Sequence, residues 1–346
     1  MQVIKVASAG VAKLQSAPLP QIRPGYVLVR VAYVSLNPTD WKHVDFLPSF
    51  GATVGCDYSG TVEEVGSMVK TPWKKGDRIA GFTHGVNAVE QEDGCFAEFC
   101  VAKGDCQMGV PNNVSLEEAA TLGVGVTTVG QALYQSLKLP LPPNPSELSL
   151  WILVYGGNTA TGALAIQYAK LSGPRVVTIC SAANFAYAEA LGADKAFTYD
   201  DADCGAQVRS YTDNNLIHAF DCISEGSSAQ ICCDAISVRG GYISYLLPTE
   251  TPRRDVFGHH TLAYTFKGEP FLFGDVTYPA SSEDHEFAQF FWQTSTRLFV
   301  DRRLKAHRYE VRSGGLQGVL EGLADLKKGT VRGKKLVYKV GEIGLE

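Results

Sequence analysis

The most constraining feature of this sequence is a regular alternation of short apolar runs and longer helix-forming stretches between residues 151 and 247. Each apolar run has the length of a buried strand, and each stretch that follows has apolar residues at helical spacing. The expected strands are 151–156, 175–180, 195–199, 216–223 and 240–247, and the expected helices are 162–173, 184–193, 204–212 and 228–237. This alternation predicts an α/β fold with a parallel, doubly wound sheet.

The sequence on either side follows a different pattern. Short strands separated by glycine predict a small barrel or sandwich in the first 125 residues; they are expected at 26–37, 58–66, 74–82 and 94–102. Ser115 and Glu118 form a capping-box pattern at the start of a helix. A proline-rich break at 138–149 then separates this helical stretch from the alternating region.

The last part of the sequence is expected to return to the first. A long amphipathic helix is predicted at 282–304 and a closing strand at 333–340. Because a late strand can pair with an early one in space, we expect a β-rich catalytic domain made of 1–125 and 269–346. A nucleotide-binding domain, 126–268, is inserted between these two parts.

Charge and composition exclude several classes of protein. The net charge is −5 and the pI is about 5.8, which argues against binding to nucleic acid or to a membrane surface. No apolar stretch approaches the roughly 20 residues that span a bilayer. The N-terminus has no basic segment followed by a long apolar one. We therefore expect a cytoplasmic protein.

Cysteine and histidine usage predicts free thiols and no metal. The nine cysteines include no C-x-x-C pair, so unpaired thiols in a reducing compartment are expected. The seven histidines show no H-E-x-x-H or zinc-finger spacing.

The turn "GGNTATG", residues 156–162, follows the first expected strand of the alternating region and opens its first helix. In such a turn, glycines allow the backbone to approach a pyrophosphate, and the helix start binds the phosphate. The usual G-x-G-x-x-G is incomplete here. Thr159 and Thr161 offer hydroxyl donors in place of open backbone. The alternative interpretation is an ordinary strand–helix turn capped by threonine.

The second expected strand ends at Ser181-Ala182-Ala183-Asn184, with no acid before Glu189. Enzymes that bind NAD place an acid at this strand end to hold the ribose 2′-hydroxyl. A carboxylate would repel a 2′-phosphate, whereas serine and asparagine can donate to it. NADP is therefore favoured, with Lys42 or Arg332 as candidates to balance the phosphate charge.

Several stretches that together span nearly the whole chain are characteristic: "SLNPTDWK", "GCDYSGTVEEVG", "KKGDRIAGF", "GVGVTTVGQAL", "LKLPLPP", "VYGGNTATGALAIQYAKLSG", "TICSAANF" and "GKKLVYKV". They resemble the medium-chain dehydrogenase/reductase superfamily and, within it, the fungal trans-acting enoyl reductases of iterative polyketide synthases. The resemblance implies a discontinuous GroES-like catalytic domain and a Rossmann cofactor domain.

The zinc-ligand positions of this superfamily are altered. Asn37 stands where zinc alcohol dehydrogenases have a ligand cysteine, and their G-H-E is Gly55-Cys56-Asp57 here. There is also no four-cysteine lobe. Since one thiol without partners does not make a zinc site, we predict no metal and a packed thiol at Cys56.

The resemblance implies specific site residues. NADPH contacts are implied at Thr39, Asp40, Trp41, Lys42, Asn158, Thr159, Ala160, Thr161, Ser181, Ala182, Ala183, Asn184, Tyr199, Tyr245, Leu246, Arg332 and Gly333. Substrate contacts are implied at Thr128, Val129, Gly130, Gln131, Glu269, Pro270, Phe271, Leu272 and Phe273. On spacing alone, Phe271 and Phe273 read as core. Lys42 or Thr128 is the candidate catalytic group, and water is the alternative proton source.

The implied reaction is hydride transfer from NADPH to the β-carbon of an α,β-unsaturated acyl thioester, followed by protonation at the α-carbon. The implied partner is the acyl carrier domain of a highly reducing polyketide synthase or a polyketide synthase–peptide synthetase hybrid. The protein is expected to be a monomer. Basic doublets that suit an acidic carrier are Arg253-Arg254, Arg302-Arg303 and Lys327-Lys328. Alternatives are a zinc-free quinone or alkenal reductase acting on free small molecules, and a non-redox accessory protein that retains NADPH.

Overall fold

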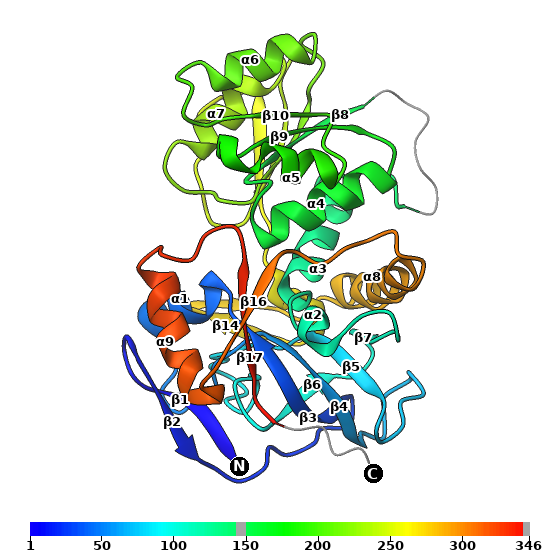
Figure 1. The fold of residues 1–346 in the computed structure, drawn as a ribbon, viewed down its shortest axis with the longest axis vertical. Coiled ribbons are helices and arrows are strands. Elements are labelled where there is room, and N and C mark those ends of the chain that lie inside the picture. The colour runs from blue at the N-terminus through cyan, green and yellow to red at the C-terminus, as the bar shows by residue number, and fades with distance from the viewer. Residues whose placement is uncertain (143–149, 342–346) are drawn as a thin grey trace. The chain divides into compact units, whose positions relative to one another are not determined.

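The computed structural model describes residues 1–142 and 150–341. The chain forms two compact units: Met1–Thr127 with Tyr264–Glu346, and Thr128–Ala263. Figure 1 traces both units along the chain. The segment 264–268, which the sequence assigns to the nucleotide-binding region, belongs to the first compact unit. The functional domain limits 1–125, 126–268 and 269–346 remain a prediction.

The second unit contains the predicted parallel sheet. Its strand order is β10-β9-β8-β11-β12-β13, and every neighbouring pair is parallel. The strands are β8 (Trp151–Tyr155), β9 (Arg175–Ile179), β10 (Lys195–Phe197), β11 (His218–Asp221), β12 (Gly241–Tyr245) and β13 (Val256–His260). The chain starts in the middle, winds to one edge and then returns to the other. This is the Rossmann order.

Helices connect the successive strands from β8 to β12, as the alternating pattern predicts. They are α4 (Ala160–Leu171), a 3₁₀ turn (Ala182–Asn184) with α5 (Phe185–Ala190), α6 (Cys204–Tyr211) and α7 (Ser228–Ala235). Sequence analysis missed β13. This strand lies at the sheet edge and buries only its first residue, Val256, so it lacks the apolar run of a central strand.

The first unit is built on a seven-stranded sheet, with the order β16-β17-β3-β4-β5-β7 and β6 paired to β3. Its strands are β3 (Tyr26–Ser35), β4 (Asp57–Val65), β5 (Arg78–Phe82), β6 (Phe99–Lys103), β7 (Gln107–Gly109), β16 (Tyr309–Arg312) and β17 (Lys335–Lys339). The strand expected at 94–102 begins only at Phe99. The closing strand β17 pairs antiparallel with β3, which confirms that a late strand rejoins the early region.

Two hairpins, five α-helices and a 3₁₀ turn, Ala263–Lys267, whose first residue belongs to the second unit, complete the described part of this unit. The hairpins are β1 (Gln2–Ser8) with β2 (Val11–Ser16), and β14 (Phe271–Phe273) with β15 (Val276–Tyr278). The helices are α1 (Pro38–Phe46), α2 (Leu116–Ala119), α3 (Gly123–Gly130), whose last residues enter the second unit, α8 (Ser282–Val300) and α9 (Gly315–Lys327). Ser115 caps α2 by accepting the Glu118 N–H at 3.1 Å. The helix after this cap is only one turn long.

The nine cysteines are all free and buried, as predicted. The search for membrane-crossing helices, made on residues 1–142 and 150–341, found none of sufficient length and apolar character.

A buried ion pair joins the C-terminal strand to the centre of the first unit. Lys335, the first residue of β17, pairs with the carboxylate of Asp57, the first residue of β4, and both side chains are buried. Lys335 Nζ also donates to Asn37 Oδ1 at 2.9 Å. Asp57 Oδ1 accepts the Val124 N–H at 2.6 Å near the start of α3. One ion pair therefore joins β17, β4, α3 and the residue that precedes α1.

Removing the cation should be costly. Lys335→Met leaves the Asp57 carboxylate buried without its charge partner, so we expect the free energy of unfolding to fall by about 3–5 kcal/mol. Urea unfolding measures this. The matched control is Lys334→Met, because Lys334 is the exposed neighbour and pairs with Glu310 at the surface; its cost should stay below about 1 kcal/mol. Equal losses in the two variants would contradict the central role of the buried pair.

Candidate cofactor and substrate site

The glycine turn between β8 and α4 is tightly packed. Gly156 has φ +83°, a conformation that favours glycine. A Cβ on Gly157 would clash with Thr178 Oγ1, and a Cβ on Gly162 would clash with the carbonyl oxygen of Gly156. Gly162 thus allows α4 to pack closely on the turn. These contacts match the turn and packing roles of glycine in a dinucleotide-binding fold.

Thr159 closes the start of α4. Its hydroxyl oxygen accepts the Gly162 N–H at 3.0 Å, so Thr159 is the N-cap of the helix. The cap uses a lone pair and leaves the hydroxyl hydrogen available as a donor. Asn158, Thr159, Ala160 and Thr161 are all partly accessible. Capping and phosphate binding by Thr159 are therefore compatible.

The end of β9 carries polar groups and no acid. Ser181 opens the 3₁₀ turn that contains Ala182, Ala183 and Asn184. Asn184 Nδ2 donates to Ser181 Oγ at 2.8 Å, and this bond fixes the two side chains relative to each other. The Ser181 hydroxyl hydrogen remains able to donate to an anion.

The remaining predicted cofactor positions of the second unit differ in accessibility. Tyr199 is exposed, whereas Tyr245 is 1% exposed and lies in the core cluster of this unit. Leu246 follows β12, and its N–H donates to Ser224 Oγ at 2.9 Å. A contact at Tyr245 would therefore have to come from its backbone.

In the first unit, α1 carries the predicted residues Thr39–Lys42. Asn37 is the N-cap of α1, and Asp40 Oδ2 accepts the Asn37 N–H at 2.7 Å. The Asp40 carboxyl is buried, and this burial raises its pKa to about 7. Its side chain thus caps the helix inside the unit. Trp41 and Lys42 are partly accessible, with Lys42 Nζ 5.8 Å from the centre of the Trp41 ring.

Arg332 and Gly333 lie in the turn before β17. Arg332 is exposed, and its Nε donates to the carbonyl oxygen of Gly329 at 3.4 Å. Gly333 has φ +65°, a conformation that glycine adopts without strain.

Most residues of the predicted substrate segments are buried or bonded to other parts of the protein. Residues Thr128, Val129, Gly130 and Gln131 are buried where α3 passes into a π-helical turn, Gln131–Ser136. Glu269 accepts a hydrogen bond from the Tyr26 hydroxyl and pairs with Lys103. Pro270 and Leu272 are exposed. The contacts of Glu269 could not be predicted from sequence patterns, because Tyr26 and Lys103 are distant in the chain.

Phe271 and Phe273 belong to an aromatic cluster that sequence analysis did not predict. His84 stacks on Tyr264 with ring centres 4.0 Å apart, and Phe271 and Phe273 pack edge-on against His84 and His43 respectively. Burial lowers the pKa of His43 to about 4, and it lowers the pKa of His84 well below its ordinary value. Both imidazoles are neutral at pH 7.

The Tyr264 hydroxyl links this cluster to α1. It lies 2.9 Å from Thr39 Oγ1 and 3.8 Å from Cys56 Sγ. Thr39 and His43 are four residues apart on one face of α1, with Thr39 Oγ1 3.5 Å from His43 Nε2, and this spacing was a usable sequence signal. Tyr264 comes from a distant part of the chain and gave no such signal.

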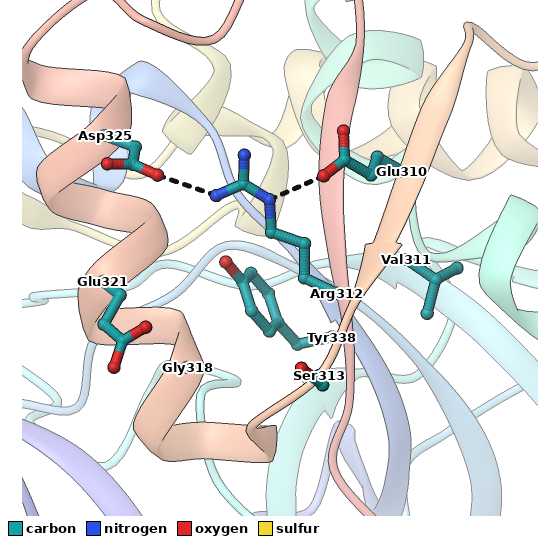
Figure 2. A pocket seen from close by; sticks show the side chains of 8 residues that line it. All are labelled: Glu310, Val311, Arg312, Ser313, Gly318, Glu321, Asp325 and Tyr338. Carbon is teal, nitrogen blue, oxygen red and sulfur yellow. Dashed lines mark hydrogen bonds and ion pairs between the residues drawn. The ribbon is translucent and has the colours of Figure 1, made fainter.

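A separate pocket of the first unit lies between β16, α9 and β17. Figure 2 shows Arg312 held between two carboxylates, with 2.8 Å to both Glu310 and Asp325. The pocket is lined by Glu310, Val311, Arg312, Ser313, Gly318, Glu321, Asp325 and Tyr338. No predicted site residue lines it, and its cation is already paired.

Comparisons with known proteins agree with this architecture. Residues 23–112 match the family described as alcohol dehydrogenase GroES-like domain, and residues 160–263 match zinc-binding dehydrogenase. The trans-enoyl reductase resD of Aspergillus sclerotiorum is 44% identical over 98% of this chain and 99% of its own length. ACTTS2 of Alternaria alternata, also a trans-enoyl reductase, is 45% identical over 98% of each chain. TOXD of Cochliobolus carbonum, another, is 52% identical over 75% of this chain and 88% of its own. The chain belongs to the trans-enoyl reductase family.

Solved structures of more distant sequence share the fold. An alcohol dehydrogenase superfamily protein from Novosphingobium aromaticivorans gives a TM-score of 0.82 at 20% identity, over 99% of this chain and 100% of that one. The CurK enoyl reductase gives 0.75 at 17% identity, over 98% and 99%. The predicted fold class, a discontinuous GroES-like domain with a Rossmann domain, is confirmed.

Although one matched family is described as zinc-binding, the residues present do not fit a zinc ion. Among residues 1–142 and 150–341 no group of three or more His, Cys, Asp or Glu side chains could hold a metal. The side-chain oxygen of Asn37 already accepts a hydrogen bond from Lys335. Burial raises the pKa of the Cys56 thiol well above its ordinary value, whereas a zinc ligand must be a thiolate. Cys56 is the packed thiol that the sequence predicts.

Substitution of the two threonines in the turn should distinguish helix capping from ligand binding. Thr159→Val removes the N-cap acceptor and should cost about 1 kcal/mol of folding stability. Thr161→Val should leave stability within about 0.5 kcal/mol. Both should weaken NADPH binding, measured by titration of intrinsic fluorescence. If NADPH affinity is unchanged in both variants, the threonines only stabilise the start of the helix and do not bind the cofactor.

Asp40 should make stability depend on pH. Its folded pKa of about 7 lies above its ordinary value of 3.8, so the folded chain holds a proton that the unfolded chain has released. The stability from this proton is complete below the lower value and is lost as pH rises through the higher one. Relative to Asp40→Asn, which cannot ionise, the wild type should lose up to about 1.4 kcal/mol per pH unit in this window. Urea midpoints at several pH values measure the difference; parallel curves would contradict the assignment.

Proposed function

We propose that this protein is an NADPH-dependent, trans-acting enoyl reductase that reduces the α,β-unsaturated acyl thioester of a carrier-bound polyketide intermediate in secondary metabolism. The observation that carries the proposal is identity of 44–52% to several trans-enoyl reductases over most of the chain. The tightly packed glycine turn of the Rossmann unit supports a dinucleotide. The same superfamily fold also serves quinone oxidoreductases, so the substrate class needs its own test.

The choice of NADPH over NADH rests on the end of β9. Ser181 and Asn184 occupy the place where NAD enzymes carry an acid. Their hydroxyl and amide groups can donate to a 2′-phosphate, while Asn158–Thr161 at the start of α4 receive the pyrophosphate. Contacts at Thr39–Lys42, Tyr199, Tyr245-Leu246 and Arg332-Gly333 complete the proposed cofactor site.

NADPH, when bound, supplies the hydride that reaches the β-carbon of the substrate. The chain must hold the alkene against the cofactor, stabilise the negative charge that develops on the thioester oxygen and exclude water. We assign the charge stabilisation to Lys42 or Thr128, by a hydrogen bond to that oxygen. The α-carbon then takes a proton from one of these groups or from water. Thr128–Gln131 and Glu269–Phe273 are the proposed substrate contacts.

The proposed partner is a separate highly reducing polyketide synthase, or a polyketide synthase–peptide synthetase hybrid, whose acyl carrier domain presents the substrate. The relatives are named trans-enoyl reductases, and this name supports a chain that works beside such a synthase. We propose that the protein acts as a monomer in the cytoplasm.

Purified protein should oxidise NADPH when given crotonyl thioester, and should not oxidise it with free quinones or reduce NADP⁺ with alcohols. Lys42→Met should lower kcat/KM by about 10- to 100-fold if Lys42 binds the developing charge, with NADPH affinity followed separately. The control is Lys13→Met, a basic residue on β2, which should change neither value. Faster turnover of free quinone than of crotonyl thioester would support a quinone reductase. Tight NADPH binding with no turnover would support the non-redox alternative.

A further inference from the structure

Helix α8 of the first unit ends in a turn that carries two exposed arginines. The Arg302 N–H donates to the Phe299 carbonyl oxygen at 3.1 Å, and the Arg303 N–H donates to that of Leu298 at 2.9 Å. This pair of bonds defines a Schellman motif, with Arg302 at the position that glycine usually occupies. Arg302 has φ +57°. The helix therefore ends on an arginine in a left-handed conformation.

This conformation is costly for any residue with a Cβ and nearly free for glycine. The guanidinium of Arg302 offers no compensation, because it forms no ion pair or side-chain hydrogen bond with another described residue, and it is exposed. A left-handed conformation at an exposed residue that carries a Cβ is a reason to look for a role of the side chain.

The same segment concentrates positive charge. Residues 297–308 read "RLFVDRRLKAHR", with Asp301 as the single acid. Burial lowers the pKa of His307 to about 4, so this residue is neutral at pH 7. The exposed cations, which we call the α8 basic turn, are Arg297, Arg302, Arg303, Lys305 and Arg308. They lie on a chain whose net charge is −5.

One residue of each of the other two basic doublets has structural contacts. Arg253 pairs with Asp255 and donates to the carbonyl oxygens of Cys233 and Ile236 at 2.7 and 2.9 Å, at the end of α7. Lys327 pairs with Asp45 at 2.6 Å. By contrast, Arg302 and Arg303 have no charged partner among the residues that the structure describes.

We propose that the α8 basic turn is the docking surface for the acidic face of the acyl carrier domain that delivers the substrate. The identity of the partner rests on the proposed function, and the location of the docking surface rests on charge complementarity. A cluster of one charge sign steers an oppositely charged partner and makes association depend on salt. We commit to the carrier surface because the five cations are exposed and are spread over residues 297–308, which suits the extended face of a protein partner.

Glycine at position 302 provides a sharp test, since strain and charge predict opposite effects. Arg302→Gly should raise Tm by about 1–3 °C because the left-handed turn becomes unstrained. It should also raise KM for a crotonyl carrier domain by ~3-fold, and Arg302→Gly/Arg303→Ser by ~10-fold, with a weaker dependence of KM on salt. For crotonyl-pantetheine, kcat/KM should stay within about 2-fold of wild type, since this substrate has no carrier surface.

The matched control is Lys138→Gly. Lys138 is also an exposed basic residue in the left-handed conformation, with φ +54°, and it follows the helical turn Gln131–Ser136. Its replacement should raise Tm in the same way and leave KM for the crotonyl carrier domain unchanged.

Three results would overturn the docking proposal. The first is an unchanged KM for the crotonyl carrier domain in the double variant. The second is an equal loss with crotonyl-pantetheine. The third is a loss that appears already with crotonyl-4′-phosphopantetheine, which would place the phosphate of the arm on this turn. Absence of NADPH oxidation by the wild type with every crotonyl substrate would instead contradict the proposed function itself.

Discussion

The buried pair of Lys335 and Asp57 is the interaction on which the first unit depends. It places opposite charges in the interior, where each would be strongly destabilising alone, and joins residues 278 positions apart. The pair holds β17 beside β3 and fixes the start of α3 through the Val124 N–H. It also engages Asn37, the N-cap of α1. The helix that carries Thr39 and Lys42 is therefore anchored to the last strand of the sheet.

The anchor uses a residue at a position where zinc alcohol dehydrogenases have a metal ligand. Asn37 lies at a ligand position of zinc alcohol dehydrogenases, and here its amide oxygen accepts from Lys335. Burial favours the protonated form of Asp40 and the thiol of Cys56. These two groups are therefore held in forms that lack the negative charge of a metal-bound carboxylate or thiolate. Charge stabilisation in the proposed reaction is therefore assigned to polar and cationic side chains.

Sequence alone was sufficient for the Rossmann unit and insufficient for much of the site. The βαβ alternation predicted β8 to β12 because each is a short apolar run next to a helix. It missed β13 because this mostly exposed strand follows β12 without an intervening helix. Glycines 156, 157 and 162 predicted a close turn from local rules alone. The cluster of His84, Tyr264 and Phe271 could not be predicted, because its members come from separate segments and meet only in three dimensions. The burial of the Tyr245 side chain could not be predicted either, because a sequence pattern gives the residue type and not its accessibility.

The central claim is that this protein saturates a carbon–carbon double bond on an acyl chain made by another enzyme. Its most direct test is reconstitution of a highly reducing polyketide synthase, one without a working reductase of its own, with and without this protein, using NADPH deuterated at the transferable position. The account predicts a product with a newly saturated bond and deuterium at the former β-carbon only when this protein is present. Identical products in both reactions, across synthases known to need a reductase in trans, would contradict it.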